Sequence, residues 1–416
     1  MIRFNIRPLM LALSFYLTLP IFNVLGMKYF QDAWIFNKFS ILIVFFVFII
    51  NLNSIIKKNI IPLLIAFLLV TTALFFSYLI QTWHGYAVNI KTNNTHILLM
   101  TLLLFYFCYK STIFDLSLYI FKPIFVVSAL LAFAYLFIPN LIRELSLYST
   151  NLIGINSIFV DREFRFSSVF SEPSKLAIFS GIAFFYYMDR NEKLMSAISL
   201  TFLILSMSKF AIVFVPVCII LSLLLRRVAL TGRVVLIFTF ITSYIIFLLA
   251  YSHWLNYLYS IVSYESLNTY ETRFGFPIIA LSNIISIPLG VGIFDGYRYV
   301  MLNGDFTIAS YCNELINSGG NCYEMSSYSL NSLAEFFPKD ILSTLIFYYG
   351  FIGVLLIYIY GYYVTTKMSN ACYYYTPLYI FLCLLFVTSY DYMIIVLALM
   401  VIGVKKDCNN TWGRVC

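Results

Sequence analysis

The stretch LMSAISLTFLILSMSKFAIVFVPVCIILSLLL, residues 194–225, decides how often this chain crosses a membrane. At 1.5 Å per residue, a single helix over it measures about 48 Å, whereas the hydrocarbon core of a bilayer is about 30 Å thick. The polar tetrapeptide SMSK, residues 206–209, stands in its middle. We therefore predict two short spans, 194–207 and 209–225, joined by a tight turn at the polar residues.

The rest of the chain is just as apolar, with 62% hydrophobic, 19% aromatic and only 11% charged residues. A soluble core could not use so much apolar side chain, which indicates an integral membrane protein. Its net charge of +8 gives no reason to expect a nucleic-acid partner. We expect an all-α polytopic protein with about 12 transmembrane helices, near residues 8–26, 39–56, 60–81, 96–109, 117–138, 174–188, 194–207, 209–225, 233–252, 341–365, 372–388 and 390–404.

Basic residues predict the orientation of these spans. With a cytoplasmic N-terminus, most of the basic turns lie on the cytoplasmic side, as the positive-inside rule requires. A single span over residues 194–225 would move Arg226 and Arg227 to the far side, so the rule favours the split. The first apolar run has a basic start but lacks a small-residue cleavage site, so we expect it to be retained as a span.

Five segments follow from this topology. They are N-terminal transmembrane helices (1–138), a first periplasmic loop (139–173), central transmembrane helices (174–252), a large periplasmic loop (253–340), and C-terminal transmembrane helices with a cytoplasmic tail (341–416). The large loop includes the apolar sequence FPIIALSNII, for which we expect a surface helix.

Cysteine and histidine usage bears on disulfides and cofactors. Cys312 and Cys322 share the large outer loop, and in an oxidising periplasm they could form a disulfide; two free thiols are the alternative. The three histidines are scattered and no cysteine pair has zinc-ligand spacing. A phosphate-cradling glycine loop is also missing from the sequence, so we expect no metal or nucleotide cofactor.

Charged residues gather at the expected outer ends of helices. Glu172 precedes Pro173, a residue suited to the first turn of a helix, so its carboxylate lies near the positive end of a helix dipole. Interfacial Lys and Arg often reach to lipid headgroups, so a surface-anchor reading stays open. Charges near membrane depth also mark functional cavities. The candidates for a reaction centre are Arg165, Glu172, Lys209, Arg273, Lys339 and Asp340.

Three segments that contain these candidate residues resemble motifs of a known family. RFSSVFSEPSKLA, residues 165–177, resembles the Arg-x-x-Gly-x-Phe-x-Glu-Pro-x-x-x-Ala signature of bacterial O-antigen polymerases, in the superfamily shared with O-antigen ligases. LILSMSKFAIVFVPV resembles that superfamily's Ser-Arg-x-x hairpin tip, with Lys209 where arginine is usual. KDILSTLIFYYGFIG is similar to the element that closes its large periplasmic loop, with Asp340, Gly350 and Gly353 in matching places.

Two departures from the family pattern stand out. Ser168 replaces the expected glycine, which we expect to alter only a loop. Lys339 stands where the ligase-type element has a histidine proposed to assist catalysis, so no histidine base can be carried over to this position. The second departure weakens the ligase reading and favours polymerase.

The resemblance implies a GT-C-like, metal-independent glycosyltransferase of the bacterial inner membrane with its active site facing the periplasm. Such an enzyme transfers the growing glycan from undecaprenyl diphosphate onto the next lipid-linked repeat unit during lipopolysaccharide biosynthesis. Its expected partners are the undecaprenyl diphosphate-linked oligosaccharide, membrane lipid and a chain-length regulator protein.

The candidate residues suit this chemistry, because negative charge develops on the departing diphosphate. We hypothesise that Arg165 and Arg273 grip the diphosphate, with Lys209 or Lys339 adding positive charge. Glu172 would deprotonate the acceptor hydroxyl or orient Arg165, and the sequence leaves both roles open. Asp340 is the second candidate base. A carboxylate beside cations has a depressed pKa, which favours orientation over base work unless partial burial offsets it.

Other functional classes make different predictions. A transporter of lipid-linked or small solutes would carry charges deep inside its spans and broken helices at the midplane. An O-antigen ligase would hand finished glycan to the lipid A core and should show the missing histidine. A structural scaffold would not need Arg165, Glu172, Lys209 and Arg273 on one rim.

Overall fold

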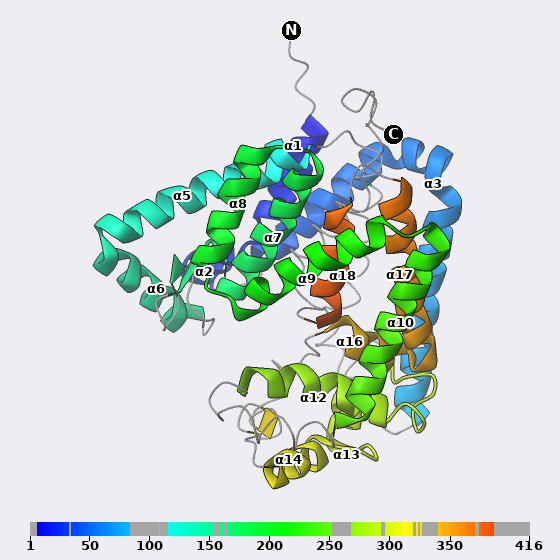
Figure 1. The fold of residues 1–416 in the computed structure, drawn as a ribbon. Helices are drawn as coiled ribbons and strands as arrows, with labels where there is room; N and C mark the ends of the chain where they lie inside the picture. The colour runs from blue at the N-terminus through cyan, green and yellow to red at the C-terminus, as the bar shows by residue number, and fades with distance from the viewer. Residues whose placement is uncertain are drawn as a thin grey trace.

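The computed structural model of this chain describes residues 6–32, 35–83, 108, 115–153, 159–160, 165–170, 172–251, 268–292, 296–318, 322, 325–326, 340–370 and 374–386. The described part is mainly helical (Figure 1). Three of its helices are long and apolar enough to cross a membrane, or up to four if one bent pair counts as a span, and several shorter apolar helices accompany them. The expected span 390–404, and that at 96–109 apart from Cys108, lie outside the described residues.

The N-terminal helices depart from the expected spans. The first apolar run forms two helices, α1 (Ile6–Tyr16) and α2 (Pro20–Phe30), bent by 75°. Pro20 begins α2, where its missing N–H costs nothing. The predicted spans 39–56 and 60–81 form one continuous helix, α3 (Ile35–Trp83). Lysine is a good helix former, so the polar residues between the two predicted spans do not end the helix, although α3 changes direction along its length (Figure 1).

A hairpin of helices and a pair of short strands lead to the central part of the chain. A π-helical turn, η2 (Ser117–Phe121), continues into α5 (Lys122–Phe137), and the two together form a candidate span. One residue later α6 (Pro139–Ile153) begins and folds back toward α2 (Figure 1). Strand β1 (Phe159–Val160) pairs antiparallel with β2 (Phe166–Ser168), which packs on α5 and α7.

The central helices confirm the split of residues 194–225. Helix α7 (Pro173–Asp189) packs along α8 (Lys193–Leu205), and α9 (Lys209–Arg226) begins after a three-residue turn. Met207, the central residue of this turn, has φ 48°, a left-handed conformation that stops the helix. The Ser206 hydroxyl donates to the carbonyl of Leu203 at 2.6 Å and so satisfies a group at the end of α8.

The predicted large loop, residues 253–340, contributes helices to the buried core. Its helices are α12 (Asn268–Ser282), α13 (Gly296–Asn303) and α14 (Ile308–Asn317), reached from the candidate span α10 (Leu230–Leu249). The expectation of a surface helix over FPIIALSNII is wrong. Phe276 and the residues from Ile278 to Leu281 are almost fully buried, because α12 packs between α10, α14 and α16.

The C-terminal region contains a broken helix. The predicted span 341–365 forms α16 (Ile341–Tyr349) and α17 (Phe351–Asn370), which are separated at Gly350. Gly350 has φ 57°, a conformation that glycine adopts without a Cβ penalty. The next helix, α18 (Tyr375–Phe386), lies against α7, α9 and α17.

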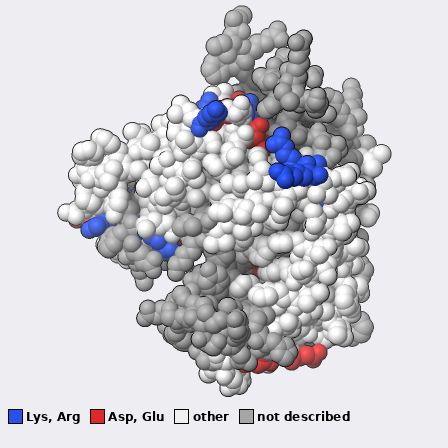
Figure 2. Space-filling view, viewed as in Figure 1, with Lys and Arg blue, Asp and Glu red and all other residues white. Residues whose placement is uncertain are grey.

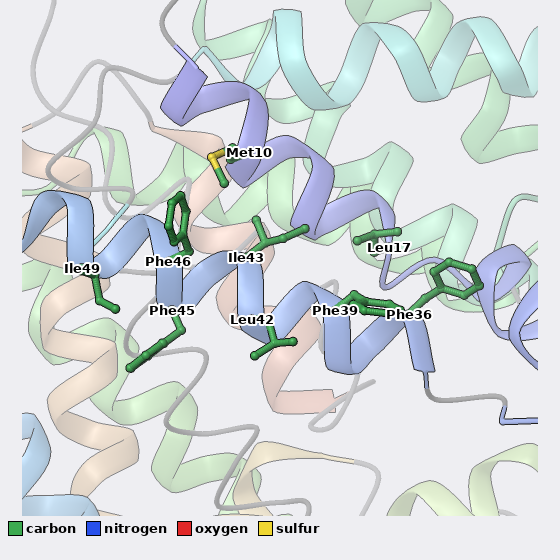
Figure 3. A pocket seen from close by; sticks show the side chains of 9 residues that line it. All are labelled: Met10, Leu17, Phe36, Phe39, Leu42, Ile43, Phe45, Phe46 and Ile49. Atoms are coloured by element: carbon green, nitrogen blue, oxygen red, sulfur yellow. The ribbon is translucent and has the colours of Figure 1, made fainter. Parts of the chain in front are cut away.

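An apolar hollow of about 610 Å³ lies beside α1 and α3 (Figure 3). All of its lining side chains are apolar, so the hollow suits contact with hydrocarbon and offers no group for acid–base chemistry. These residues are Met10, Leu17, Phe36, Phe39, Leu42, Ile43, Phe45, Phe46 and Ile49.

Charge is divided between two ends of the visible face. Most of the Lys and Arg on this face lie where α7 meets α8 and α9 meets α10, together with some acidic residues, and two smaller basic patches lie at the left near α6. Acidic residues also appear at the opposite end near α13 (Figure 2). Exposed Arg190, Arg226 and Arg227 belong to the basic end, and exposed Asp305 follows α13. Most of the surface between them is neither acidic nor basic (Figure 2). The division agrees with a membrane-crossing chain whose basic turns lie on one side.

Candidate functional site

The start of α7 places Glu172 at the mouth of a buried helix. Glu172 has extended backbone (φ −152°, ψ 147°), and its carbonyl accepts the Lys175 N–H at 3.1 Å. Its half-buried carboxylate accepts a hydrogen bond from the Ser174 hydroxyl at 3.0 Å and makes no side-chain cap to the helix backbone. The next turns of α7 are almost entirely buried. Its carboxylate therefore lies at the edge of the core rather than inside it.

The strand before Glu172 is fixed by a strained turn. Arg165, half-buried, comes directly before β2. Ser168 ends the strand with φ 55°, and its hydroxyl shares a 2.7 Å hydrogen bond with the Ser128 hydroxyl on α5. A left-handed conformation costs a non-glycine residue about 1–2 kcal/mol. The expectation that Ser168 alters only a loop is therefore incomplete, since this residue occupies a backbone position that favours glycine.

Asp340 caps α16 from a buried position. Only 2% of Asp340 is exposed. Its carboxylate accepts the Ser343 N–H at 2.7 Å and the Ser343 hydroxyl at 2.6 Å. Its carbonyl accepts the Thr344 hydroxyl at 2.7 Å. Asp340 therefore stabilises the first turn of the helix, an N-cap role that short acidic side chains favour.

Helices α7 and α18 run antiparallel. Asp189, the last residue of α7, accepts hydrogen bonds from the N–H groups of Tyr374, Tyr375 and Thr376 at 2.9–3.0 Å, at the beginning of α18. Midway along α7, a Cβ on Gly181 would overlap the Tyr379 ring. The Glu172 end of α7 therefore lies toward the C-terminal end of α18.

Aromatic contacts gather further helices around that end of α18. The Phe386 ring lies 5.5 Å from Phe214 of α9 and 4.5 Å from Tyr244 of α10, measured between ring centroids. Asp340 is within electrostatic reach of Tyr244. Phe214 follows Lys209 by little more than one helical turn. Helices α9 and α16 therefore both pack against α18.

Arg273 belongs to α12, which packs against α10 and α16. The next residue, Phe274, has its ring 5.9 Å from Phe247, which lies one turn beyond Tyr244 on α10. Helix α12 also packs on α16, which Asp340 caps. The backbone of Arg273 and of Lys209 is described, but their side chains, and the whole of Lys339, lie outside the described residues.

Those predicted reaction-centre residues that the structure describes lie at the starts of α7, α9 and α16, directly before β2 and in α12. Helix α7 runs from Glu172 to the basic turn at Arg190, and α10 runs from the basic turn at Arg226 and Arg227 toward α12. Arg165, Glu172 and the backbone of Arg273 are thus all opposite the basic turns. A carboxylate and cations at such an end could bind an anionic group and accept a proton. Among the residues that the structure describes, no group of His, Cys, Asp or Glu could hold a metal ion.

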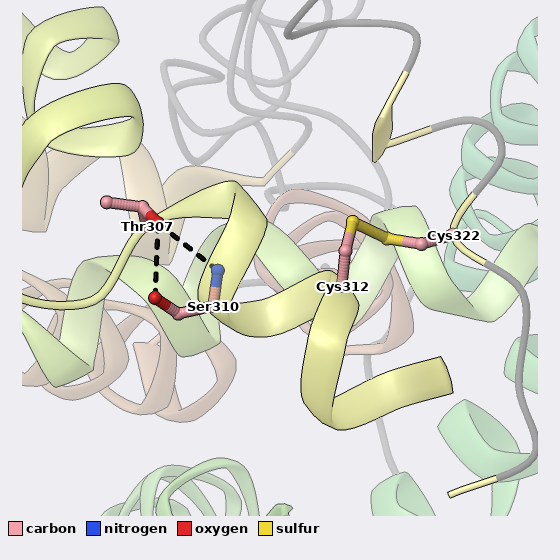
Figure 4. Close-up of a disulfide and its surroundings, with 4 residues drawn as sticks. All are labelled: Thr307, Ser310, Cys312 and Cys322. Atoms are coloured by element: carbon pink, nitrogen blue, oxygen red, sulfur yellow. Dashed lines mark hydrogen bonds between the residues drawn. A yellow bond between two sulfur atoms is a disulfide. The ribbon is translucent and has the colours of Figure 1, made fainter. Parts of the chain in front are cut away.

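Helices α12 and α14 belong to a braced unit next to this end. Cys312 and Cys322, the pair considered from the sequence, form a disulfide with a Cα–Cα distance of 5.3 Å, and Thr307 caps α14 by accepting the Ser310 N–H at 3.2 Å (Figure 4). Tyr251, just beyond α10, lies 6.2 Å from Tyr311 of α14 between ring centroids. Burial, and then its hydrogen bond to the Glu314 carboxylate, raise the pKa of Tyr251.

A pair of interlocked glycines joins this unit to the broken helix. The Phe351 N–H donates to the Pro288 carbonyl at 2.9 Å, and the Val291 N–H donates to the Phe347 carbonyl at 2.6 Å. A Cβ on Gly290, where φ is 75°, would strike the backbone of α16, and one on Gly350 would strike the backbone at Pro288. The turn after α12 thus satisfies the backbone groups that the break at Gly350 exposes.

Sequence reasoning missed several residues of this arrangement. Tyr244 lies within an apolar run and gives no local signal of its approach to Asp340. Gly290 could have been noticed, because Pro-Leu-Gly-Val-Gly at residues 288–292 is typical of a turn. Asp189 caps α18, a role that no pattern in the sequence indicates.

Comparison of this chain with family models, curated proteins and solved structures gives no match.

Proposed function

We propose that this chain is an O-antigen polymerase, which transfers the growing glycan from undecaprenyl diphosphate onto the next lipid-linked repeat unit at the periplasmic face of the bacterial inner membrane. The observation that carries the proposal is the turn leading to Glu172. Ser168 adopts a left-handed conformation at the position where the polymerase signature has glycine, four residues before the signature's glutamate. Glycine favours this backbone conformation, which supports the resemblance to the signature although the glycine itself is replaced.

In the proposed reaction, the acceptor hydroxyl oxygen forms a bond to the anomeric carbon of the donor glycan. The bond from that carbon to the diphosphate oxygen breaks, and its electron pair leaves with the diphosphate. Glu172 takes the proton of the acceptor hydroxyl, since its carboxylate is half-buried at the helix mouth and accepts a hydrogen bond from only one neighbouring hydroxyl among those described.

Arg165 and Arg273 hold the departing diphosphate in this proposal, with Lys209 or Lys339 adding positive charge. A guanidinium can bind two phosphate oxygens at once, and a fixed cation at the leaving group is worth about 3 kcal/mol of barrier lowering. Asp340 then orients the start of α16 and does not accept the proton, because its carboxylate oxygens already accept hydrogen bonds from Ser343 within the core.

A genetic experiment tests the function. The gene is deleted in its smooth bacterial host and the lipopolysaccharide is separated on a gel. A single repeat unit on the core supports a polymerase. Complete loss of repeat units would instead indicate a ligase or a transporter of the lipid-linked unit, and unchanged banding would reject all three.

Complementation then tests the site. Arg165→Ala, Glu172→Ala and Arg273→Ala should each fail to restore long polysaccharide chains, while Arg143→Ala, an exposed arginine of α6, should restore them. Immunoblotting of membranes checks that every variant is present at the level of the unaltered protein. Full-length ladders from all three site variants would reject the site.

A further inference from the structure

Helix α6 presents a buried side and a polar side. Ile142 and Ser146, one turn apart, are 4% and 5% exposed and pack toward the core. Arg143 and Glu144 are exposed on the other side of the helix, where Leu147 is exposed as well. This much would suit an ordinary surface helix with one face in water.

A third stripe on α6 does not suit water. Leu141, Leu145 and Tyr148 follow each other at the four- and three-residue spacing that places side chains on one helix face. They are 48%, 42% and 47% exposed. The stripe lies between the buried side and the polar side, where an amphipathic helix that rests on a membrane meets the acyl chains.

The exposed apolar surface of a candidate membrane span leads up to α6. Helix α5 belongs to a candidate membrane span, and its Phe133 and Phe137 are 62% and 68% exposed. Ile138, also exposed, is the only residue between α5 and α6. No break thus separates the apolar surface of the span from α6.

We propose that α6 lies in the membrane–water interface, with Leu141, Leu145 and Tyr148 among the phospholipid acyl chains. At 1.5 Å per residue the helix covers about 22 Å of the membrane surface. The Lys28 ammonium of α2 also lies over the Tyr148 ring, 5.6 Å from its centroid. Tyrosine is enriched at the depth of the headgroups, where an ammonium can reach a lipid phosphate.

A consequence for the reaction rests on the proposed function. Helix α6 packs on β1, β1 pairs with β2, and β2 ends four residues before Glu172. A helix held at the headgroup level therefore holds Glu172 near that level. A diphosphate carried by a membrane lipid lies at the same level, so α6 would set the depth of the carboxylate relative to its substrate.

Photo-crosslinking in native membranes tests the location of α6. Benzoylphenylalanine replaces Leu145 on the stripe, Glu144 on the polar side as the matched control, or Ile142 on the buried side in the full-length chain. After irradiation, mass spectrometry of the α6 peptide should show phospholipid adducts from position 145, no lipid adduct from position 144, and crosslinks within the chain from position 142. Adducts of position 145 to another protein would assign the stripe to a protein partner. Absence of lipid adducts at both positions would place the stripe in water, and equal lipid labelling at positions 144 and 145 would mean that the helix has no side turned to water. Any of these three results would overturn the proposal.

A second variant separates this inference from the proposed function. Leu141→Lys with Leu145→Lys places two charges on the stripe and should shorten the polysaccharide ladder of the complemented strain. Lipid adducts at position 145 of the otherwise unaltered chain, with a normal ladder from the double variant, would retain the membrane location and reject its consequence for Glu172. Unchanged polysaccharide on gene deletion would reject the polymerase and leave the crosslinking result standing.

Discussion

The starts of α7 and α16 look alike in sequence but differ in structure. Each helix follows an acidic residue in extended backbone, Glu172 or Asp340. Asp340 is buried and accepts two hydrogen bonds from Ser343, whereas Glu172 is half-buried and binds the Ser174 hydroxyl. The same position at a helix start can therefore stabilise the fold or present a carboxylate for chemistry. Under the proposed function, the number of local donors around each carboxylate distinguishes the two roles.

Glu172→Gln tests whether Glu172 accepts the proton, and it has the largest expected effect. An amide cannot take the acceptor proton, so the rate of glycan extension should fall by about 10²- to 10⁴-fold. The free energy of unfolding should stay unchanged, because Glu172 makes no side-chain cap to its helix. The rate is measured in proteoliposomes supplied with lipid diphosphate-linked repeat units. Glu144→Gln, an exposed carboxylate on α6, is the matched control and should keep full activity.

Much of the central fold could be predicted because its signals are local. Polar serines in the middle of a 194–225 run that is too long for one crossing predicted the turn at Met207, and Pro173 predicted the start of α7. The continuity of α3 could not be predicted from hydropathy, because lysines interrupt an apolar run without interrupting a helix. The break at Gly350 depends on a turn at Pro288 that lies far away in sequence.

The candidate site could be predicted by residue type and by helix end, but not by role. The sequence made Glu172 a candidate for base or for orienting Arg165 and Asp340 the second candidate base, and the hydrogen bonds from Ser343 to Asp340 do not follow from spacing. From the sequence, Ser168 was only a departure from a motif. Its φ of 55° shows that it occupies a backbone conformation that favours glycine. Charge patterns in the sequence indicate which ends of the helices carry the candidate residues. The contacts of each residue are known only from the packed structure.

Gly350→Ala tests how firmly α16 is held at its other end. The new methyl group would meet the backbone of Pro288, and alanine would be forced to φ 57°. Strain of this kind costs about 1–3 kcal/mol, to which the clash adds. We expect the free energy of unfolding in detergent to fall by about 3 kcal/mol.

Gly361→Ala is the control for this substitution. It adds the same methyl group within α17, where its neighbours are the movable side chains of Ile237 and Ile241, and it should cost far less. Equal losses from the two variants would mean that the interlock with Gly290 contributes nothing specific.

Asp340→Ala and Asp340→Asn separate the cap from the charge. Alanine removes the acceptor for Ser343, so the free energy of unfolding should fall by about 1–2 kcal/mol. Asparagine keeps an oxygen that can accept the Ser343 N–H, so stability should fall less and glycan extension should continue. Chemical denaturation measures the first effect and the proteoliposome assay the second. If Asp340→Asn stops extension as completely as Glu172→Gln does, Asp340 is not a purely structural residue, and the proposed difference between the two acids is wrong.

Ser168→Gly has the smallest expected effect and tests the route by which the chain reaches Glu172. Glycine relieves a left-handed conformation worth about 1–2 kcal/mol, but it loses a hydroxyl hydrogen bond to Ser128 worth about 1 kcal/mol. The two effects oppose each other, so the free energy of unfolding should change by less than about 1 kcal/mol. Ser168→Ala loses the hydrogen bond while keeping a Cβ at φ 55°, and should be the less stable of the two by denaturation. Because the hydroxyl only anchors the turn to α5, glycan extension should survive in Ser168→Gly. Equal stability of the glycine and alanine variants would show that the backbone here is not strained and would remove the physical link between this turn and the glycine of the polymerase signature.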